Sequence, residues 1–379
     1  MRFRHVGLTA AFGAAFALHG CSAPEQAEVA EQSTVYVPVS ARQVPALEEP
    51  AQRYVLPVEE SIVGYLPGGG IGNPGRFKIA ALPGDRVAAI DLLDGTLSIL
   101  ERSAGLPATR PRTEPLPGLT GIALTVGAGG EHVMLGTGGP PGLVAIGFDN
   151  SIAASAPLPG TPWKLEAVGD GTFVAVLMET GFVGRFAASG DELAHYTVFG
   201  IPDGDIGGEV HLWPQQDFVV SGEMLYVTTA ETYEITAFSI DGQAQWVVRH
   251  DAERLPIPEH LSGQTMGRDR RAGRAAGATI DAEYADVRFP EFYPSLARIN
   301  TDAASRLYVF PYVVESDAGR YPVDVYDVDG NVLVAGWLPF QGWDAQAGNS
   351  VYRVEARDGN RAIVRYELTL PNAGTAAAQ

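Results

Sequence analysis

A short acidic stretch near the middle of the chain contains residue types that bind metal ions. The sequence PDGDIGGEVHLW brings four of them close together, namely Asp203, Asp205, Glu209 and His211. Carboxylates and an imidazole are ligands for calcium or for a transition metal. The alternative, which we favour, is a Gly-rich acidic loop with solvated carboxylates. No cofactor is therefore expected, and Ca²⁺ or another divalent metal stays open as a ligand of these four residues.

Signatures of hydrolytic enzymes are missing from the sequence. It contains no G-x-S-x-G and no H-E-x-x-H motif, and its single cysteine cannot form a thiol pair. The histidines after residue 20 are not spaced two or four positions apart, so no compact zinc site can be read. We assign no catalytic residue, although ligands could still converge from distant parts of the chain.

The charge of the chain is strongly negative. Its 379 residues carry a formal net charge of −19, and Lys78 and Lys164 are the only lysines. A general nucleic-acid binder needs clustered cations to displace counterions from phosphate. We therefore expect no nucleic-acid partner.

The N-terminus has the pattern of a signal peptide. Two arginines precede an apolar run from Val6 to Leu18, and Cys21 follows shortly after. Such a run is too short to span a bilayer of roughly 30 Å as a helix, but it suits the core of a signal peptide. Leu18 and Gly20 resemble a bacterial lipobox, so we expect residues 1–20 to be removed and Cys21 to be lipidated. The alternative is an ordinary secretory signal with an incidental cysteine.

The residues around this signal predict that the protein is located in the cell envelope. Several acyl chains on Cys21, including an N-linked one such as palmitate, would give stable anchoring. Ser22 in place of Asp resembles outer-membrane sorting, so we expect the periplasmic face of the outer membrane or the cell surface. Residues 21–52 are rich in Ala, Glu, Gln and Pro and predict a flexible tether, and residues 371–379 predict a disordered tail.

Short alternating apolar runs separated by turn residues predict an all-β fold. In VDVYDVDGNVLVAGW, residues 323–337, Asp329 and Gly330 lie between two such runs. A calcium loop with Gly330 at its sixth position would need an acidic residue where Val325 stands and a glutamate where Gly336 stands. Both ends fail, so we expect a β-hairpin.

The strand groups recur at about 45 residues, the length of a four-stranded propeller blade. Their starts are marked by Phe77, Thr120, Trp163, Trp213, Tyr293 and Trp343. These starts predict a six-bladed β-propeller over residues 53–370, with residues 251–288 as an insertion. The last blade is one strand short, and pairing the chain ends would remove two exposed sheet edges. We therefore expect residues 53–66 to supply the missing strand.

The segment FPEFYPSLARINTDAASRLYVFPYV, followed by the hairpin above, resembles the six-bladed propeller lipoproteins of the NHL-repeat and TolB-like type. The positions that carry this resemblance are Tyr293, Pro294, Asn300, Asp302, Leu307 to Val309, Asp329 and Gly330. The resemblance implies the fold. It implies no single function, because propellers serve as lyases, lactonases, receptors and scaffolds.

Aromatic residues at the starts of the blades are candidate ligand-binding residues. In a propeller these positions meet around the axial opening, and aromatic rings suit the rim of a pocket. The candidates are Trp163, Trp213, Tyr293 and Trp343, together with the adjacent Asp344. The alternative is that the rings pack between neighbouring sheets as core.

These observations predict a monomeric, lipid-anchored propeller in the cell envelope. We expect it to bind an envelope protein or a small-molecule ligand without catalysis. The alternative is a metal-dependent hydrolase or lactonase with its ion in the central funnel. That alternative requires Asp, Asn, Glu or His side chains converging on the axis from at least three blades.

Overall fold

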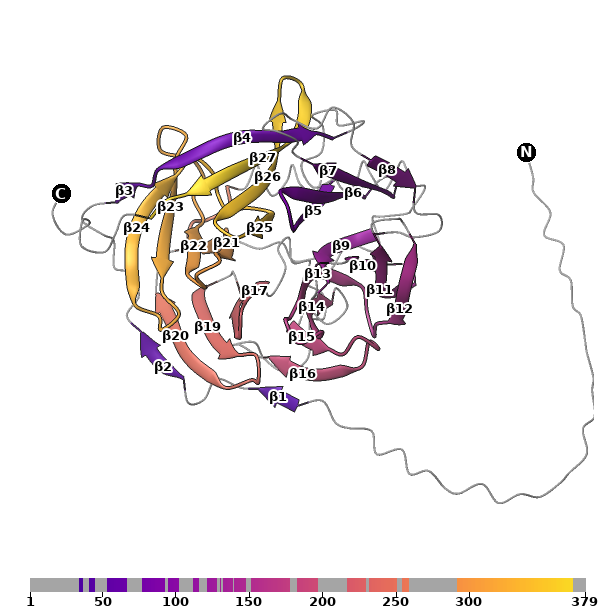
Figure 1. Cartoon of the computed structure of the whole chain (residues 1–379). Helices are drawn as coiled ribbons and strands as arrows, with labels where there is room; N and C mark the ends of the chain where they lie inside the picture. Colours follow the sequence, from indigo (N-terminus) through magenta and orange to yellow (C-terminus); the bar gives the residue numbers. More distant parts are fainter. Residues whose placement is uncertain are drawn as a thin grey trace, which may run out of the picture. The chain divides into compact units, whose positions relative to one another are not determined.

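The chain forms a six-bladed β-propeller (Figure 1). The computed structural model describes residues 34–36, 41–44, 53–66, 77–92, 95–101, 112–115, 121–127, 130, 132–138, 140–147, 151–177, 183–196, 217–229, 232–250, 254–258 and 292–370. Every regular element within these ranges is a β-strand. In particular, no helix among these residues is long and apolar enough to cross a membrane.

Each blade is an antiparallel sheet whose four main strands follow the chain outward from the axis, except that the sixth takes its outer strand from the N-terminus. Blade 1 contains β5 (Phe77–Leu82), β6 (Arg86–Asp91), β7 (Thr96–Glu101) and β8 (Arg112–Pro115), and blade 2 contains β9 (Gly121–Val126), β10 (His132–Gly138), β11 (Pro141–Gly147) and β12 (Ile152–Pro157). Blade 3 contains β13 (Pro162–Ala167), β14 (Phe173–Leu177), β15 (Val183–Phe186) and β16 (Glu192–Tyr196), and blade 4 contains β17 (Asp217–Ser221), β18 (Met224–Thr228), β19 (Tyr233–Ser239) and β20 (Ala244–His250). Blade 5 contains β21 (Leu296–Thr301), β22 (Leu307–Pro311), β23 (Tyr321–Tyr326) and β24 (Val332–Leu338), and blade 6 contains β25 (Ala345–Ala347), β26 (Ser350–Arg357), β27 (Asn360–Leu368) and β4 (Val58–Tyr65). The first strands of the six blades begin within a few residues of the predicted starts.

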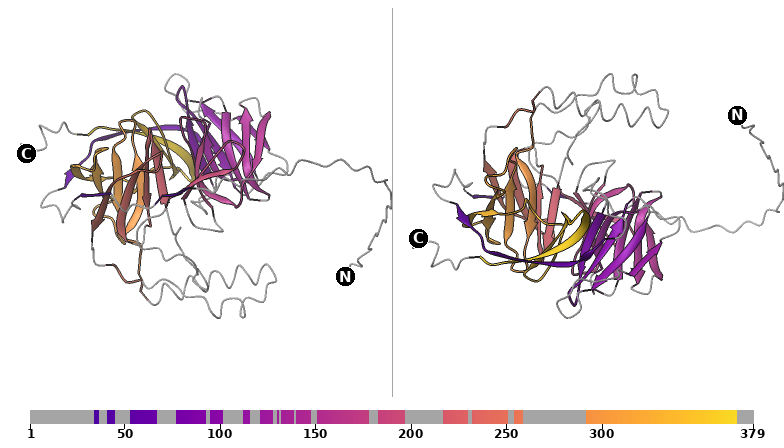
Figure 2. Two further views of the ribbon diagram at one scale, coloured as in Figure 1. Left: turned by 90° about the horizontal axis from the view of Figure 1, so that it is seen from below. Right: turned by 90° about the horizontal axis from the view of Figure 1, so that it is seen from above.

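The N-terminal strand closes the ring as predicted. β4 pairs antiparallel with β27 from Val58↔Leu368 to Tyr65↔Ala362, which covers the edge that blade 6 would otherwise expose. Side views show the strands of blades 1 and 2 standing next to one another across the thickness of the ring (Figure 2).

Two stretches of the segment that we expected to be a flexible tether, residues 21–52, are strands. β1 (Thr34–Tyr36) adds in parallel to β16, and β2 (Arg42–Val44) adds in parallel to β20. β3 (Tyr54–Val55) continues the series on β24. β1, β2, β3 and β4 therefore lie in chain order on the outer edges of blades 3, 4, 5 and 6, because each blade offers an open edge there (Figure 1). These short strands could not be predicted from a pattern, since runs of two or three residues have no measurable period.

The core lies between the blades. Six clusters of buried apolar residues each combine side chains from two neighbouring blades, because successive residues of a strand face opposite sides of its sheet. Leu82 and Leu135, for example, join blades 1 and 2, whereas Ile79 and Tyr352 join blades 1 and 6. Burial of apolar area between adjacent blades, at about 25 cal/mol per Å², is thus the main force that holds the ring together.

The stretch with three aspartates is a hairpin, as predicted. Its turn spans Asp327 to Asn331 and contains more than the two-residue turn that Asp329 and Gly330 suggested. Asp327 accepts the backbone N–H groups of Asp329 and Asn331 at 3.0 and 2.8 Å, and the Nδ2 of Asn331 at 2.9 Å. The carboxylate is therefore occupied by turn formation.

Several predicted features fall on residues outside the described ranges. They are the signal peptide at 1–20 with Cys21, the tail at 371–379, and most of the insertion at 251–288. At the start of the insertion, Pro256 forms an isolated bridge with Phe292, and the Leu255 carbonyl accepts the N–H of Tyr293 at 2.8 Å.

Candidate functional site

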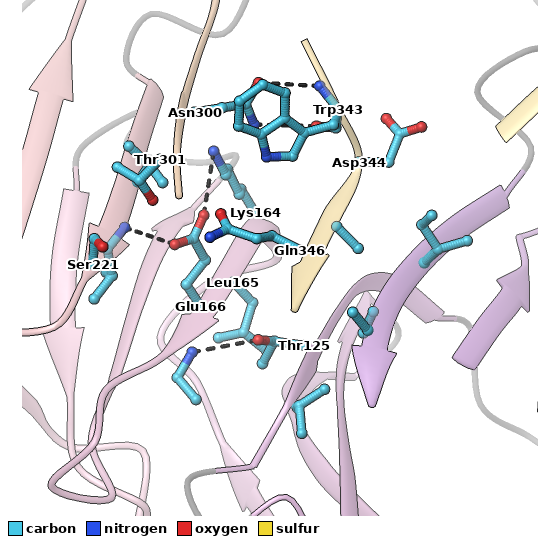
Figure 3. Close-up of a pocket in the computed structure, with 18 of the residues that line it drawn as sticks. Thr125, Lys164, Leu165, Glu166, Ser221, Asn300, Thr301, Trp343, Asp344 and Gln346 are labelled. Atoms are coloured by element: carbon cyan, nitrogen blue, oxygen red, sulfur yellow. Dashed lines mark hydrogen bonds and ion pairs between the residues drawn. The ribbon is translucent and has the colours of Figure 1, made fainter. Parts of the chain in front are cut away.

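A cavity of about 690 Å³ lies at the centre of the ring, and all six blades line it. Each blade contributes residues of its innermost strand or of the turn beside that strand. One such residue from each blade, in order, is Ala80, Leu124, Glu166, Ser221, Thr301 and Gln346. The last four of these are labelled in Figure 3. Because an inner strand presents its backbone and alternate side chains to the axis, the propeller brings together residues that are far apart in the sequence.

An ion-pair cluster joins blades 3 and 4 at the cavity wall. Lys164 Nζ lies 2.9 Å from Asp217 Oδ1 and 3.4 Å from Glu166 Oε1, and it also donates to the carbonyl oxygen of Phe218. Glu166 Oε2 accepts the backbone N–H of Val220 at 2.7 Å. Figure 3 shows both contacts of Glu166 as dashed lines. The cation and both carboxylates of this cluster therefore have partners inside the protein.

Burial and charge compete in setting the protonation of this cluster. Desolvation disfavours the ammonium of Lys164, but Asp217 and Glu166 outweigh it and raise the pKa of that group above its ordinary value. Desolvation also raises the pKa of the Glu166 carboxyl, and the charge of Lys164 offsets only part of that effect. Lys164 therefore stays charged at neutral pH.

A second ion pair links blade 5 to the start of blade 6. Arg298 Nη1 lies 2.9 Å from Asp344 Oδ1, and Asp344 Oδ2 accepts the N–H of Val354 at 3.0 Å. Desolvation acts to raise the pKa of Asp344, but Arg298 and this backbone hydrogen bond hold it below its ordinary value. Next to this pair, the Asn300 amide donates to the Trp343 carbonyl and accepts the Trp343 N–H, both at 3.1 Å.

Lys78 has a different environment from Lys164. Its Nζ lies 5.4 Å from the centroid of the Trp163 ring, a cation–π arrangement between blades 1 and 3. Among the described residues no carboxylate lies within ion-pairing distance of this amine. Desolvation, followed by the charge of Arg298, lowers the pKa of Lys78.

The five candidate binding residues have different environments, and one of them lies outside the described ranges. Trp163 lines the cavity with 43% of its surface exposed, and Asp344 lines it too. Trp343 borders the cavity but is only 2% exposed, and its ring packs edge-on against Tyr308 and Phe310. Tyr293 stacks on Tyr312 with centroids 4.9 Å apart and is not among the cavity-lining residues. Trp213 lies outside the described ranges.

The candidate metal ligands Asp203, Asp205, Glu209 and His211 also lie outside the described ranges. Within those ranges no group of three or more His, Cys, Asp or Glu side chains is placed to hold a metal ion. The acidic residues that line the cavity come from blades 3, 4, 5 and 6 and pair with Lys164, Arg298 or Arg306. The structure therefore provides carboxylates at the axis, but each one already has a cationic partner.

Sequence patterns missed most of the charged residues at this site. Lys78, Lys164, Glu166, Asp217 and Arg298 stand in ordinary strand patterns without a motif. One signal was present, since the only two lysines of the chain both line the cavity.

Comparisons with known proteins rest on structure alone, since no family model and no curated protein matches the sequence. A "putative exported protein" of Bacteroides fragilis superposes with a TM-score of 0.51 at 9% identity, over 89% of this chain and all of that one. These values establish a shared fold.

Two further solved structures are similar at lower scores. Virginiamycin B lyase from Staphylococcus aureus has a TM-score of 0.43 at 10% identity, over 83% of this chain and 100% of that one. The calcium-binding protein regucalcin from Agrobacterium tumefaciens has a TM-score of 0.45 at 12% identity, over 84% and 97%.

Proposed function

We propose that this chain is a lipoprotein of the cell envelope whose propeller binds a small ligand in its central cavity. The observation that carries the proposal is the cavity of about 690 Å³ lined by all six blades. Its volume falls within the roughly 300–1,000 Å³ that is usual for ligand pockets, and its lining mixes apolar residues with a few charged ones. A protein partner that inserts a side chain into the same cavity is the second form of this proposal.

The charges at the cavity support binding more than catalysis. Lys164, Arg298 and their carboxylate partners hold one another, which fixes the geometry of the wall. Fixed polar groups orient a ligand without a large entropic penalty when it binds. Trp163 offers an exposed ring beside them. The site therefore has an aromatic surface and pre-organised charges.

The proposed location of the protein in the cell envelope rests on its N-terminal sequence. Cys21 follows an apolar run that fits a signal peptide, and Leu18 and Gly20 resemble a lipobox. We extend the proposal to the NHL-repeat and TolB-like type of propeller lipoprotein, because Asp302 accepts backbone N–H groups of the turn after β21, where the resemblance expects an Asp-containing turn.

A metal-dependent hydrolase or lactonase is the alternative proposal. The observation that favours it is that acidic residues of four blades line the cavity. A divalent metal such as Ca²⁺ would have to displace Lys164 or Arg298 from their partners. Affinity for Ca²⁺ that is lost in Asp217→Asn and in Asp344→Asn would support this alternative over the first proposal.

The test compares the wild-type chain with a variant whose cavity is blocked. Ala303 is an exposed residue of the turn between β21 and β22 that lines the cavity, so Ala303→Trp should fill the opening and leave the core intact. Small molecules released on denaturation of protein purified from its native envelope are then identified by mass spectrometry. We expect a molecule bound to the wild type at near-stoichiometric amount and absent from the variant. The same molecule at equal amount in both proteins would refute binding in the cavity.

A further inference from the structure

The side chains of Lys78 and Trp163 meet in the cavity. Lys78 belongs to the innermost strand of blade 1, yet its Nζ lies over the ring of Trp163 in blade 3, which is not a neighbouring blade. Both residues line the cavity, so the amine lies there against an aromatic face. An ammonium group in this position is partly desolvated, and the cation–π contact compensates for part of that loss.

The two lysines form a natural pair for comparison. Lys164 has Asp217 and Glu166 beside it, whereas Lys78 has no such partner among the described residues. The charged groups that act on Lys78 are Arg298 and Lys164, which repel it, and Asp344 and Asp217, which attract it. Both of these carboxylates already bind the competing cations. Among the described residues that line the cavity, Lys78 is therefore the cation that an incoming anion can reach without breaking an ion pair.

The wall on which Lys78 stands is apolar. Apart from Lys78 and Thr125, the described residues of blades 1 and 2 that line the cavity are all apolar. Ala81 and Val126 are half-buried, and Phe77, Ile79, Ala80, Ala123 and Leu124 are buried behind them. The remaining charged residues of the lining all come from blades 3 to 6. Lys78 thus stands at the boundary between an apolar half and a charged half of the cavity.

We propose that the central cavity takes a small organic carboxylate, with its anionic head on Lys78 and its apolar body against blades 1 and 2. This inference rests on the proposed function and specifies its ligand class. A carboxylate beside Lys78 would give it the anionic partner that the described residues do not supply, and the ammonium–carboxylate contact would be strong because the site is partly desolvated. The apolar body would gain about 25 cal/mol for each Å² that it buries.

Proton uptake follows from this arrangement. The pKa of Lys78 is below its ordinary value because of desolvation and of Arg298. An anion at the amine favours its charged form and raises that pKa again. Binding should therefore be accompanied by proton uptake by Lys78 at alkaline pH.

The experiment uses the full-length chain with its lysines reductively methylated with ¹³C, so that the two lysines give separate NMR signals. Lys78→Arg assigns the Lys78 signal. The probe is hexanoate, hexan-1-ol supplies the apolar body without the charge, and inorganic phosphate supplies the charge without the body. Calorimetry on the unmodified chain gives the affinities of the wild type and of Lys78→Gln.

We expect hexanoate to raise the pKa of Lys78 by about one unit, which corresponds to about tenfold preference for the charged amine. The Lys164 signal should stay in place, and Lys78→Gln should weaken hexanoate binding about tenfold. Hexanol should leave the Lys78 signal unchanged, and phosphate should bind at least about tenfold more weakly than hexanoate.

An unchanged Lys78 signal with hexanoate, or equal affinity in Lys78→Gln, would overturn the inference. If phosphate binds as tightly as hexanoate, the proposed apolar contacts with blades 1 and 2 contribute nothing to binding, and that part of the inference is wrong. If hexanoate fails but the wild type still carries a molecule that Ala303→Trp lacks, the proposed function stands and only this inference falls.

Discussion

Arg53 and Asp324 form an ion pair of 2.7 Å that ties the N-terminal rim segment to blade 5. Asp324 is only 2% exposed, and its other oxygen accepts the hydroxyl of Tyr233 from blade 4 at 3.0 Å. Arg53 thus neutralises a carboxylate buried between two blades, and the rim segment is part of the folded unit.

Arg53→Met should lower the free energy of unfolding by about 3–5 kcal/mol at pH 7, because it leaves a buried carboxylate without its cation. Asp324→Asn in the same chain should restore most of that loss, since the amide carries no charge. Urea unfolding of the two single variants and the double variant measures both effects. Equal instability of Arg53→Met with and without Asp324→Asn would contradict this role.

The loss caused by Arg53→Met should also depend on pH. Desolvation raises the pKa of Asp324, and the positive charge of Arg53 offsets part of that increase. A carboxyl with a raised pKa holds its proton more tightly in the folded state. Its contribution to stability is therefore largest below its ordinary pKa and declines as pH rises through the folded value. Without Arg53 the folded pKa rises further, so the deficit at pH 5 should be smaller than at pH 7, and a deficit independent of pH would contradict this mechanism.

Gly330 makes a close contact that any side chain would disrupt. Its φ is +80°, and a Cβ built there would lie 2.9 Å from the ring of Trp246 in blade 4. Gly359 has a similar φ of +75° with nothing within 4 Å of such a Cβ. We expect Gly359→Ala to cost about 1 kcal/mol for the backbone alone, and Gly330→Ala to cost about 1–3 kcal/mol more through overpacking. Equal losses of unfolding free energy in the two variants, measured by urea unfolding, would mean that the turn moves to accommodate the Cβ at position 330.

The two tryptophans at blade starts should respond differently to substitution. Trp343→Ala removes a ring that is 2% exposed and packed on Tyr308, and should lower the free energy of unfolding by about 3–5 kcal/mol. Trp163→Ala removes a ring that is 43% exposed, and should change it by less than about 1 kcal/mol while weakening ligand binding. Comparable losses of stability in both variants would contradict the placement of Trp163 in the cavity.

Cys21→Ser should abolish lipid attachment, because acylation requires the cysteine sulfur. The variant should then lose membrane retention, as measured by fractionation after a high-salt wash. Retention of the variant in the membrane fraction would show that the lipid is not the anchor.

The repeat predicted most of the fold, because its signal is summed over many residues. Spacing of about 45 residues located the six blades, and the short last blade indicated the closing strand at Val58–Tyr65. The parallel rim strands β1 and β2 could not be predicted, since they contain three residues each and gain their stability from edges formed elsewhere in the chain.

The site was less predictable, since convergence at the axis is a property of the ring. Trp163 and Trp343 occupy equivalent positions in the sequence, yet one ring is exposed and the other buried. Two hydrogen bonds between the side-chain amide of Asn300 and the backbone of Trp343 hold Trp343 in the core. The sequence pattern of one strand does not predict such a contact between two blades. Asp302 likewise serves its own turn, accepting Tyr308 Oη at 2.9 Å and Arg306 Nε at 2.6 Å.

The occupant of the cavity would be visible in a crystal structure of the chain purified from its native envelope without added ligands. We expect electron density for one organic molecule in the central cavity, with an acidic group within hydrogen-bonding distance of Lys78 Nζ and its apolar part against blades 1 and 2. A cavity that contains only ordered water in that structure would contradict the account.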